Sequence, residues 1–233
     1  MKVVILAGGF GTRLSEYTNE IPKPMVPVGG KPILEHIMEI YSNFGHNEFY
    51  VAVGYKQEVI RDYFKNKKKN WNITIEDTGV GTLTGGRLKK LEKYLKDDTF
   101  SLTYGDGVSD LNIDKLLNFL KSNKKLATIT AVRPPARFGA LEINNNVVVK
   151  FKEKIQSDEN WINGGFFIFE PKIFDYLKDD KTILEKQPLE TLSEKKELVA
   201  YKHFGFWQCM DHKSDKDNLD KLIESKKASW LKN

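Results

Sequence analysis

The sequence is poor in cysteine: Cys209 is the one thiol among its 233 residues. A single thiol excludes a disulfide within one chain and favours a reducing compartment, so we expect a cytoplasmic protein. We expect Cys209 to be a small buried residue rather than a reactive thiol. The chain also lacks any run near the roughly 18 apolar residues that cross a bilayer, and its opening VVILA stretch is too short for a signal-peptide core. Neither membrane insertion nor export is therefore predicted.

A strong excess of one charge sign is also missing. The formal net charge is +5, and acidic residues are interleaved with lysine and arginine nearly everywhere. Nucleic-acid binding requires basic residues on one face together with stacking aromatics, so this pattern argues against an RNA-binding domain. A modest positive field suits small anionic substrates. The lysine-rich stretches KNKKKN and SEKKEL are interpreted as solvated loops or helix ends.

The sequence does contain a regular alternation of strand and helix patterns. Seven short β-branched or apolar runs predict strands at residues 2–6, 48–54, 73–77, 100–106, 126–132, 147–151 and 164–169. Helical patterns cover residues 31–45, 57–66, 86–96 and 110–123, the last with Asp110 as its N-cap. Alternation of this kind predicts an α/β fold: a mostly parallel, doubly wound, Rossmann-like mixed sheet flanked by helices on both faces.

The pattern changes after about residue 130. Residues 137–151 predict a short hairpin that turns at three asparagines, and residues 217–230 predict a closing helix. The chain contains no internal repeat and no low-complexity linker. We therefore expect a single domain over residues 1–233, in which the changed segment faces the substrate.

The stretch LAGGFGTR follows the first predicted strand, where doubly wound sheets usually hold phosphate. Gly8, Gly9 and Gly11 let the backbone approach an anion and turn its N–H groups toward it, while Arg13 can fork onto phosphate oxygens. A tight turn with positive φ is the alternative reading of any one glycine. Three glycines followed by Thr12 and Arg13 favour an anion site.

This loop differs from the two commonest phosphate motifs. The dinucleotide fingerprint needs glycine where Leu14 stands, and a P-loop needs Gly-Lys-Ser/Thr, which does not follow. A lysine comes instead from IPKPM, in which Pro22 and Pro24 stiffen the backbone on both sides of Lys23. An isolated lysine is normally solvated surface, but this setting makes Lys23 a candidate ligand of the same anion.

Together, LAGGFGTRL and PKPMVPVGGKPIL resemble the signature of the sugar-1-phosphate nucleotidylyltransferases. TGGRLKKL, TYGDGVSDL, INGGFFIF, QPLETL and GFWQCMD resemble the glucose-1-phosphate cytidylyltransferase branch in particular. The resemblance implies transfer of a cytidylyl group from CTP to glucose 1-phosphate or a similar phosphate, which gives CDP-glucose and pyrophosphate. The alternatives are the same reaction with UTP, GTP, dTTP or another acceptor, and a non-catalytic nucleotide-binding regulator.

Such a transfer is an in-line displacement at the α-phosphorus, and the sugar phosphate is already a competent nucleophile. The protein's task is therefore to position two polyanions and to offset charge with cations and Mg²⁺. Mg²⁺ prefers oxygen ligands and takes one or two carboxylates together with water and phosphate oxygens. Asp106, between glycines at the end of a predicted strand, is a candidate ligand, although it also fits a turn. Asp211 fits a helix cap, and the resemblance alone implies that it is the second metal ligand.

The resemblance also implies the other roles. Arg13 would hold the departing pyrophosphate, and Lys23 would offset charge where the new phosphate bond forms. The residues implied to bind the nucleotide are Leu6, Ala7, Gly8, Gly9, Gly11, Thr12, Arg13, Lys23, Thr84, Gly85, Gly86, Arg87, Gly105 and Asp106.

Within TGGR, the resemblance implies that Gly85 and Gly86 lie flat against the base while Thr84 and Arg87 offer hydrogen bonds to it. A helix entry capped by Thr84 is the alternative. The sugar-phosphate pocket is implied to contain Gly139, Glu153, Lys154, Asn163 and Gly164. Residues 1–130 would then form the nucleotide-binding part, and residues 131–233 the sugar-phosphate-binding part with the C-terminal helix. A homo-oligomer is common in the family.

Overall fold

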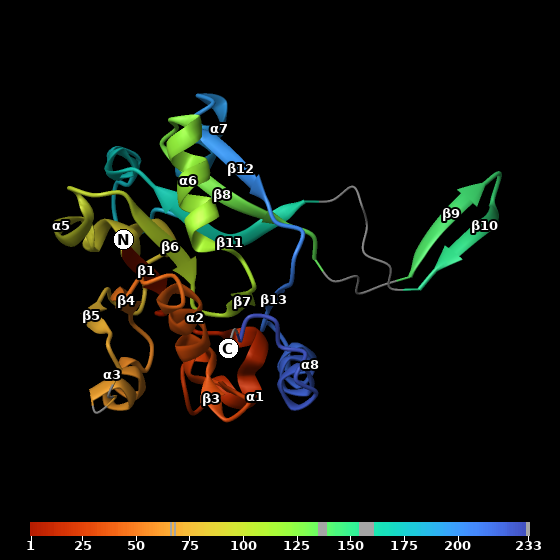
Figure 1. The fold of residues 1–233 in the computed structure, drawn as a ribbon, viewed down its shortest axis with the longest axis horizontal. Coiled ribbons are helices and arrows are strands. Elements are labelled where there is room, and N and C mark those ends of the chain that lie inside the picture. Colours follow the sequence, from red (N-terminus) through yellow and green to blue (C-terminus); the bar gives the residue numbers. More distant parts are fainter. Residues whose placement is uncertain (66, 68, 135–138, 154–160, 232–233) are drawn as a thin grey trace.

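The computed structural model describes residues 1–65, 67, 69–134, 139–153 and 161–231. Its centre is a seven-stranded sheet with the strand order β12-β8-β11-β6-β1-β4-β5 (Figure 1). Only β11 runs antiparallel to its neighbours in this sheet, and the other neighbouring pairs are parallel. The predicted mostly parallel mixed sheet is confirmed. In spatial order the strands are β12 (Leu198–Lys202), β8 (Ala127–Val132), β11 (Ile162–Phe169), β6 (Phe100–Tyr104), β1 (Lys2–Leu6), β4 (Glu48–Val53) and β5 (Asn72–Asp77).

Helices cover both faces of this sheet. Successive side chains of a strand point to opposite faces, so Val3 and Ile5 belong to one buried cluster while Val4 belongs to another. The first cluster includes side chains of α2 (Ile33–Ser42), α3 (Gln57–Lys65), α6 (Ile113–Asn123) and α8 (Lys213–Glu224). The second includes side chains of α4 (Thr84–Lys90), α5 (Glu92–Leu95), η3 (Pro171–Tyr176) and α7 (Gln187–Glu194). Burial on both faces explains why the central strands are almost continuously apolar.

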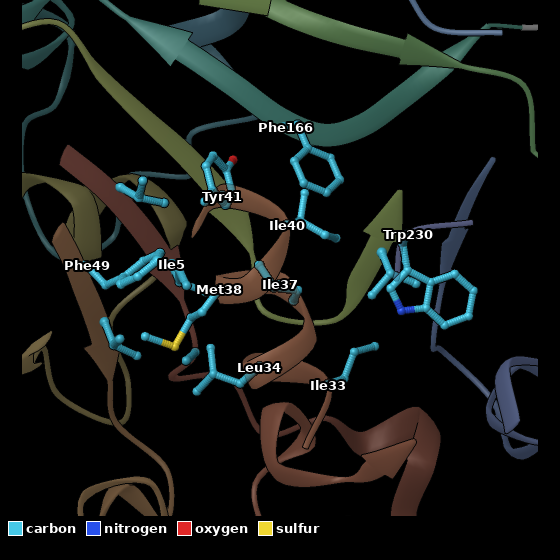
Figure 2. Close-up of a cluster of buried hydrophobic side chains, with 14 of the residues drawn as sticks. Ile5, Ile33, Leu34, Ile37, Met38, Ile40, Tyr41, Phe49, Phe166 and Trp230 are labelled. Atoms are coloured by element: carbon cyan, nitrogen blue, oxygen red, sulfur yellow. The ribbon is translucent and has the colours of Figure 1, made fainter. Parts of the chain in front are cut away.

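The helix α2 lies in the middle of the first cluster (Figure 2). Its Met38 is directed toward Ile5 and Phe49 of the sheet, and its Tyr41 lies beside Phe166, with ring centroids 6.3 Å apart. Trp230, near the C-terminus, packs into the same cluster. This packing ties the end of the chain to the helix that follows the Lys23 segment.

Several short elements connect the sheet to its helices. Near the first strand these are η1 (Thr12–Leu14), α1 (Ser15–Thr18), η2 (Lys23–Met25), β2 (Pro27–Val28) and β3 (Lys31–Pro32). A two-stranded pair, β7 (Gly107–Ser109) with β13 (Trp207–Cys209), lies beyond the end of β6. Among the described residues, no helix combines the length and the apolar character needed to span a bilayer.

The predicted hairpin is present as β9 (Ala140–Asn144) and β10 (Val147–Lys152). It turns at Asn145 and Asn146, whose φ angles of 45° and 66° lie in the left-handed region that asparagine tolerates. The hairpin projects away from the main sheet (Figure 1), and apolar side chains such as Ile143 and Phe151 are exposed. The structure holds one copy of the chain, so a homo-oligomer stays a prediction.

The predicted cap of α6 is wrong. Asn112, not Asp110, occupies the N-cap position, and its side chain accepts a hydrogen bond from the Lys115 N–H at 2.9 Å. Asp110 instead lies 3.0 Å from Nε2 of His203, at the end of β12. Asn112 caps the helix because it stands three residues before a free N–H group of the first turn, while Asp110 stands five residues before it.

The lysine stretch before β5 is more than a solvated loop. Lys67 and Lys69 place their ammonium groups 2.6 and 3.0 Å from the Glu35 carboxylate, whose side chain is 3% exposed. The Tyr63 hydroxyl donates a further hydrogen bond to Glu35. Burial opposes ionisation of Glu35, but these donors outweigh it and lower the pKa of Glu35 to about 2. The short connection thus fastens α2 to the edge of the sheet.

We expect Glu35→Gln to lower the free energy of unfolding by about 3 kcal/mol near pH 7, because a shift of one pKa unit corresponds to about 1.4 kcal/mol. The pKa of Glu35 in the folded protein is below its ordinary value of 4.5, so this stability is present above about pH 4.5. It is lost as the pH falls toward 2. Denaturant titrations between about pH 3 and 7 measure the difference. Exposed Glu58 on α3 supplies the control Glu58→Gln, and equal stability of the two variants at pH 7 would contradict the expectation.

Candidate active site

A cavity of about 400 Å³ opens beyond the carboxyl ends of the parallel strands β1 and β6. This is the edge at which doubly wound sheets bind ligands. Leu6 and Tyr104 end these two strands, and both line the cavity. The remaining lining residues are Ala7, Gly8, Gly9, Phe10, Gly11, Arg13, Lys23, Pro24, Val80, Gly81, Thr82, Leu83, Thr84, Arg87, Gly105 and Asp106.

The loop after β1 has the properties of an anion cradle. No backbone hydrogen bond joins the N–H groups of residues 8–13 to another part of the chain that the structure describes. Gly11 has a φ of +65°, and a Cβ atom there would lie 2.8 Å from Cβ of Lys23. A side chain at this position would therefore be strained and would displace Lys23. Most residues of this loop line the cavity, and N–H groups without a backbone partner beside a cavity are suited to phosphate oxygens.

Four charged side chains converge at the end of this loop. The Lys23 ammonium group lies 2.6 Å from Oδ2 of Asp106 and 2.7 Å from Oδ1 of Asp211. The Arg13 guanidinium group donates to the other Asp211 oxygen at 2.7 Å, and its side chain is 64% exposed. The predicted cations and both predicted carboxylates thus form one network, although Arg13 and Asp211 are 198 positions apart in the sequence.

The backbone around Lys23, Asp106 and Asp211 explains this convergence. Lys23 begins η2 behind an extended Pro22, and the ring of Pro24 lies close to Gly105, where a Cβ would meet it at 3.1 Å. Asp106 follows β6, and its carbonyl accepts a hydrogen bond from the Met210 N–H at 2.8 Å. That bond places Asp211 beside Asp106. Asp211 itself is not a helix cap, because His212 holds the N-cap position of α8.

The network favours the charged forms of its members. Burial opposes the charge on Lys23, but the two aspartates outweigh it and raise the pKa of Lys23 above 10.5. Burial likewise opposes ionisation of Asp211, yet Lys23 and Arg13 hold the pKa of Asp211 below its usual range. The thiol of half-buried Cys209 has a pKa of about 12, because burial and the Asp211 charge disfavour the thiolate. Cys209 is therefore not a reactive nucleophile.

The two carboxylates fit a magnesium ion. Because both reach one ammonium group, they also lie within reach of a single small cation at that position. Their oxygens are the hard ligands that Mg²⁺ prefers, and Mg²⁺ usually completes its shell with water and phosphate oxygens. The described residues contain no group of three or more His, Cys, Asp and Glu that could hold a metal by itself. A metal at Asp106 and Asp211 would accordingly depend on a phosphate ligand.

The TGGR segment forms the opposite wall, in a way that the sequence did not predict. Leu83 holds the N-cap position of α4, so Thr84 is not the cap. The Thr84 hydroxyl donates to Glu185 at 2.6 Å and accepts from the Leu184 N–H at 2.9 Å. Gly85 and Gly86 pack against residues 179–184 and do not line the cavity, and a Cβ on Gly86 would lie 2.7 Å from Cα of Asp180. Their contact with a base stays a prediction.

The Arg87 side chain holds the glycine loop in place through hydrogen bonds. Its guanidinium group is buried and donates to the carbonyl oxygens of Gly8 at 2.9 Å and Val53 at 3.1 Å, and to the Thr78 hydroxyl at 2.5 Å. A Cβ on Gly8 would lie 2.1 Å from the Arg87 side chain, so a larger residue there would displace the Arg87 guanidinium group. The structure thus shows a supporting role for Arg87, and a direct contact of Arg87 with the base stays a prediction.

The predicted sugar-side residues fall into two groups. Asn163 is near the cavity, because its amide donates to the hydroxyl of the lining residue Tyr104 at 3.0 Å. The carbonyl of its buried neighbour Gly164 accepts from Nε1 of Trp207 at 2.7 Å. Gly139 precedes β9 and Glu153 follows β10, so the two lie together at the open end of the projecting hairpin. Neither lines the cavity. Lys154 lies outside the described residues, and Thr12 is exposed without lining the cavity.

Sequence reasoning missed Tyr104 and Glu185. Tyr104 directly precedes Gly105 and Asp106, so its place at a strand end was a usable signal. Glu185 had no such signal, because only the tertiary fold brings it to Tyr104 and Thr84.

The chain is similar to known proteins in both sequence and fold. Residues 2–211 match the nucleotidyl transferase family. The chain is 47% identical to glucose-1-phosphate cytidylyltransferase of Salmonella typhimurium, over 99% of this chain and 98% of that protein. It is 41% identical to a probable glucose-1-phosphate cytidylyltransferase of Bacillus subtilis, over 99% of both. A crystal structure of a putative glucose-1-phosphate thymidylyltransferase from Bacillus anthracis matches with a TM-score of 0.76 and 18% identity, over 100% of this chain and 96% of that one, which shows a shared fold. The chain belongs to the nucleotidyl transferase family.

Proposed function

We propose that this protein transfers the cytidylyl group of CTP to glucose 1-phosphate, giving CDP-glucose and pyrophosphate. The observation that carries the proposed chemistry is the convergence of Lys23, Asp106 and Asp211 at the end of a glycine loop with free N–H groups. The choice of CTP and glucose 1-phosphate rests on the 47% identity to the Salmonella cytidylyltransferase. We also propose that the protein acts in the cytoplasm.

In this proposal the chain binds and orients, and no side chain forms a covalent intermediate. The N–H groups of the glycine loop hold the triphosphate, and exposed Arg13 holds the pyrophosphate end. A phosphate oxygen of glucose 1-phosphate attacks the α-phosphorus in line, and the bond from that phosphorus to the pyrophosphate oxygen breaks. Lys23 offsets the charge that develops at this phosphorus. Asp106 and Asp211 would hold Mg²⁺, which would supply positive charge to the phosphate oxygens.

A panel of nucleotides tests the proposal. We expect pyrophosphate release with glucose 1-phosphate to have a kcat/KM for CTP at least about tenfold above that for UTP, GTP or dTTP, because a site that hydrogen-bonds one base leaves its groups unpaired with another. Mannose 1-phosphate serves as the control acceptor. Equal or faster turnover with another triphosphate would overturn the cytidylyl assignment. No pyrophosphate with any pair of substrates would overturn the transfer reaction itself.

A non-catalytic nucleotide-binding regulator is the alternative. In such a protein the charged residues of the site would be free to change. Here Arg13, Lys23, Asp106 and Asp211 are all present and joined in one network. The geometry therefore favours catalysis.

A further inference from the structure

Glu185 joins two walls of the active-site cavity. One of its carboxylate oxygens accepts from the Tyr104 hydroxyl at 2.6 Å, and the other accepts from the Thr84 hydroxyl at 2.6 Å. Thr84 begins α4 on one wall, and Tyr104 ends β6 directly before Gly105 and Asp106. Through its two oxygens Glu185 therefore fixes the distance between these walls.

The Tyr104 side chain leads on to the sugar side. Its hydroxyl accepts from the Asn163 amide at 3.0 Å, and Oδ1 of Asn163 accepts from the Gly165 N–H at 2.8 Å. Gly165 has a φ of +75°, and a Cβ there would lie 2.6 Å from the Tyr104 ring. The ring is thus enclosed, and its orientation depends on what its hydroxyl binds.

Two hydroxyl groups bind the Glu185 carboxylate. Among the described residues, no cation pairs with it. The ion pairs within the described residues, which include those of Lys23 and Lys90 near the cavity, do not involve Glu185. A half-buried carboxylate that is bound by two hydroxyl donors orients those donors strongly, since hydrogen bonds to charged groups are the stronger ones. The arrangement holds side chains in place and contributes no group to the displacement itself.

We infer that Glu185 is a positioning residue that acts through Tyr104 to hold Asp106 and Asn163 in their working places. This inference rests on the proposed function. It assigns to Glu185 an effect on the rate of the chemical step and little effect on the binding of either substrate, because the side chain reaches the reaction only through Tyr104.

Substitution by glutamine tests the orientation without emptying the space. The amide introduced by Glu185→Gln would accept from one hydroxyl but offer N–H to the other, so Tyr104 or Thr84 would lose its acceptor. We expect Glu185→Gln to lower kcat about tenfold and to change KM for CTP and for glucose 1-phosphate less than about threefold, because misplacement of reacting groups mainly slows the chemical step. Tyr104→Phe should give the same pattern, and the double variant should be no slower than either single variant.

A matched control pair lies at the start of β4, outside the cavity. There the Tyr50 hydroxyl donates to Glu48 at 2.7 Å. Glu48→Gln and Tyr50→Phe should keep wild-type kcat. Wild-type kcat in Glu185→Gln and Tyr104→Phe, or losses that multiply in the double variant, would overturn the inference.

Hydrogen exchange separates this inference from the proposed function. In Glu185→Gln, the amides of Gly105 and Gly165, which donate to Leu6 and Asn163, should exchange at least about fivefold faster, since exchange reports local opening. This readout needs no turnover. Unchanged exchange at both amides overturns the inference in any case, whereas faster exchange in a protein without pyrophosphate release supports the positioning role and overturns the transfer reaction.

Discussion

Lys23→Ala should lower kcat for pyrophosphate release about 10²- to 10³-fold, the usual effect of removing one charge contact aimed at a transition state. The ammonium group lies between the two carboxylates and is held in its charged form by them. In the proposed reaction Asp106 and Asp211 would hold Mg²⁺, and the Lys23 ammonium group would offset charge on the phosphate oxygens. Initial rates at saturating CTP and glucose 1-phosphate measure the effect.

Two control variants isolate the charge of Lys23. Lys23→Met keeps the aliphatic stem that lies against Gly11, so it should be as slow as the alanine variant if charge decides. Lys31→Ala removes another half-buried lysine paired with a carboxylate, Glu39, outside the cavity, and it should keep the wild-type rate. A Lys23→Met enzyme with near-normal kcat would refute the proposed role. Circular dichroism should show the wild-type helix and strand signal for each variant.

The parts of the site that the sequence predicted are those with a local cause. Glycines after a first strand, and a lysine between two prolines, restrict the backbone within a few residues, so Gly11 and Lys23 were readable from their neighbours. The same holds for the hairpin, because Asn145 and Asn146 carry the turn by themselves. The parallel sheet followed from the alternation of strands and helices.

The features that the residues alone did not predict depend on contacts between distant segments. The burial of Arg87 is one, because Gly8, Val53 and Thr78 surround its guanidinium group, while its contact with a base stays a prediction. Asp110 was predicted to cap α6, but it lies beside His203, which is 93 positions further along the chain. The local sequence does not show this partner. Asp211 became a candidate only through the resemblance. A hydrogen bond from the Met210 N–H to the Asp106 carbonyl brings it to the site, and this contact joins segments far apart in the sequence. Spacing along the chain carries no information about such approaches.

Replacing Asp211 by asparagine should have the second large effect, on the requirement for Mg²⁺. Asparagine keeps the size of the side chain but removes the negative charge, so Asp106 would hold the metal alone. We expect kcat at standard Mg²⁺ to fall at least about 10²-fold and the Mg²⁺ concentration for half-maximal rate to rise at least about tenfold. Because the pKa of Asp211 lies below its usual value, this carboxylate stays ionised, and the loss should be constant between about pH 6 and 9.

A Mg²⁺ titration of pyrophosphate release, with calorimetry of Mg²⁺ and CTP binding, measures this change. Asp220→Asn is the matched control, because Asp220 also binds a lysine, Lys216, at 2.6 Å, and lies outside the cavity. Loss of Asp211 also leaves Lys23 with one carboxylate and removes the carboxylate that Arg13 binds. The nucleotide should therefore still bind the two cations, so that CTP affinity without Mg²⁺ stays equal to or above that of the wild type. An unchanged Mg²⁺ requirement in Asp211→Asn would show that the metal is held elsewhere.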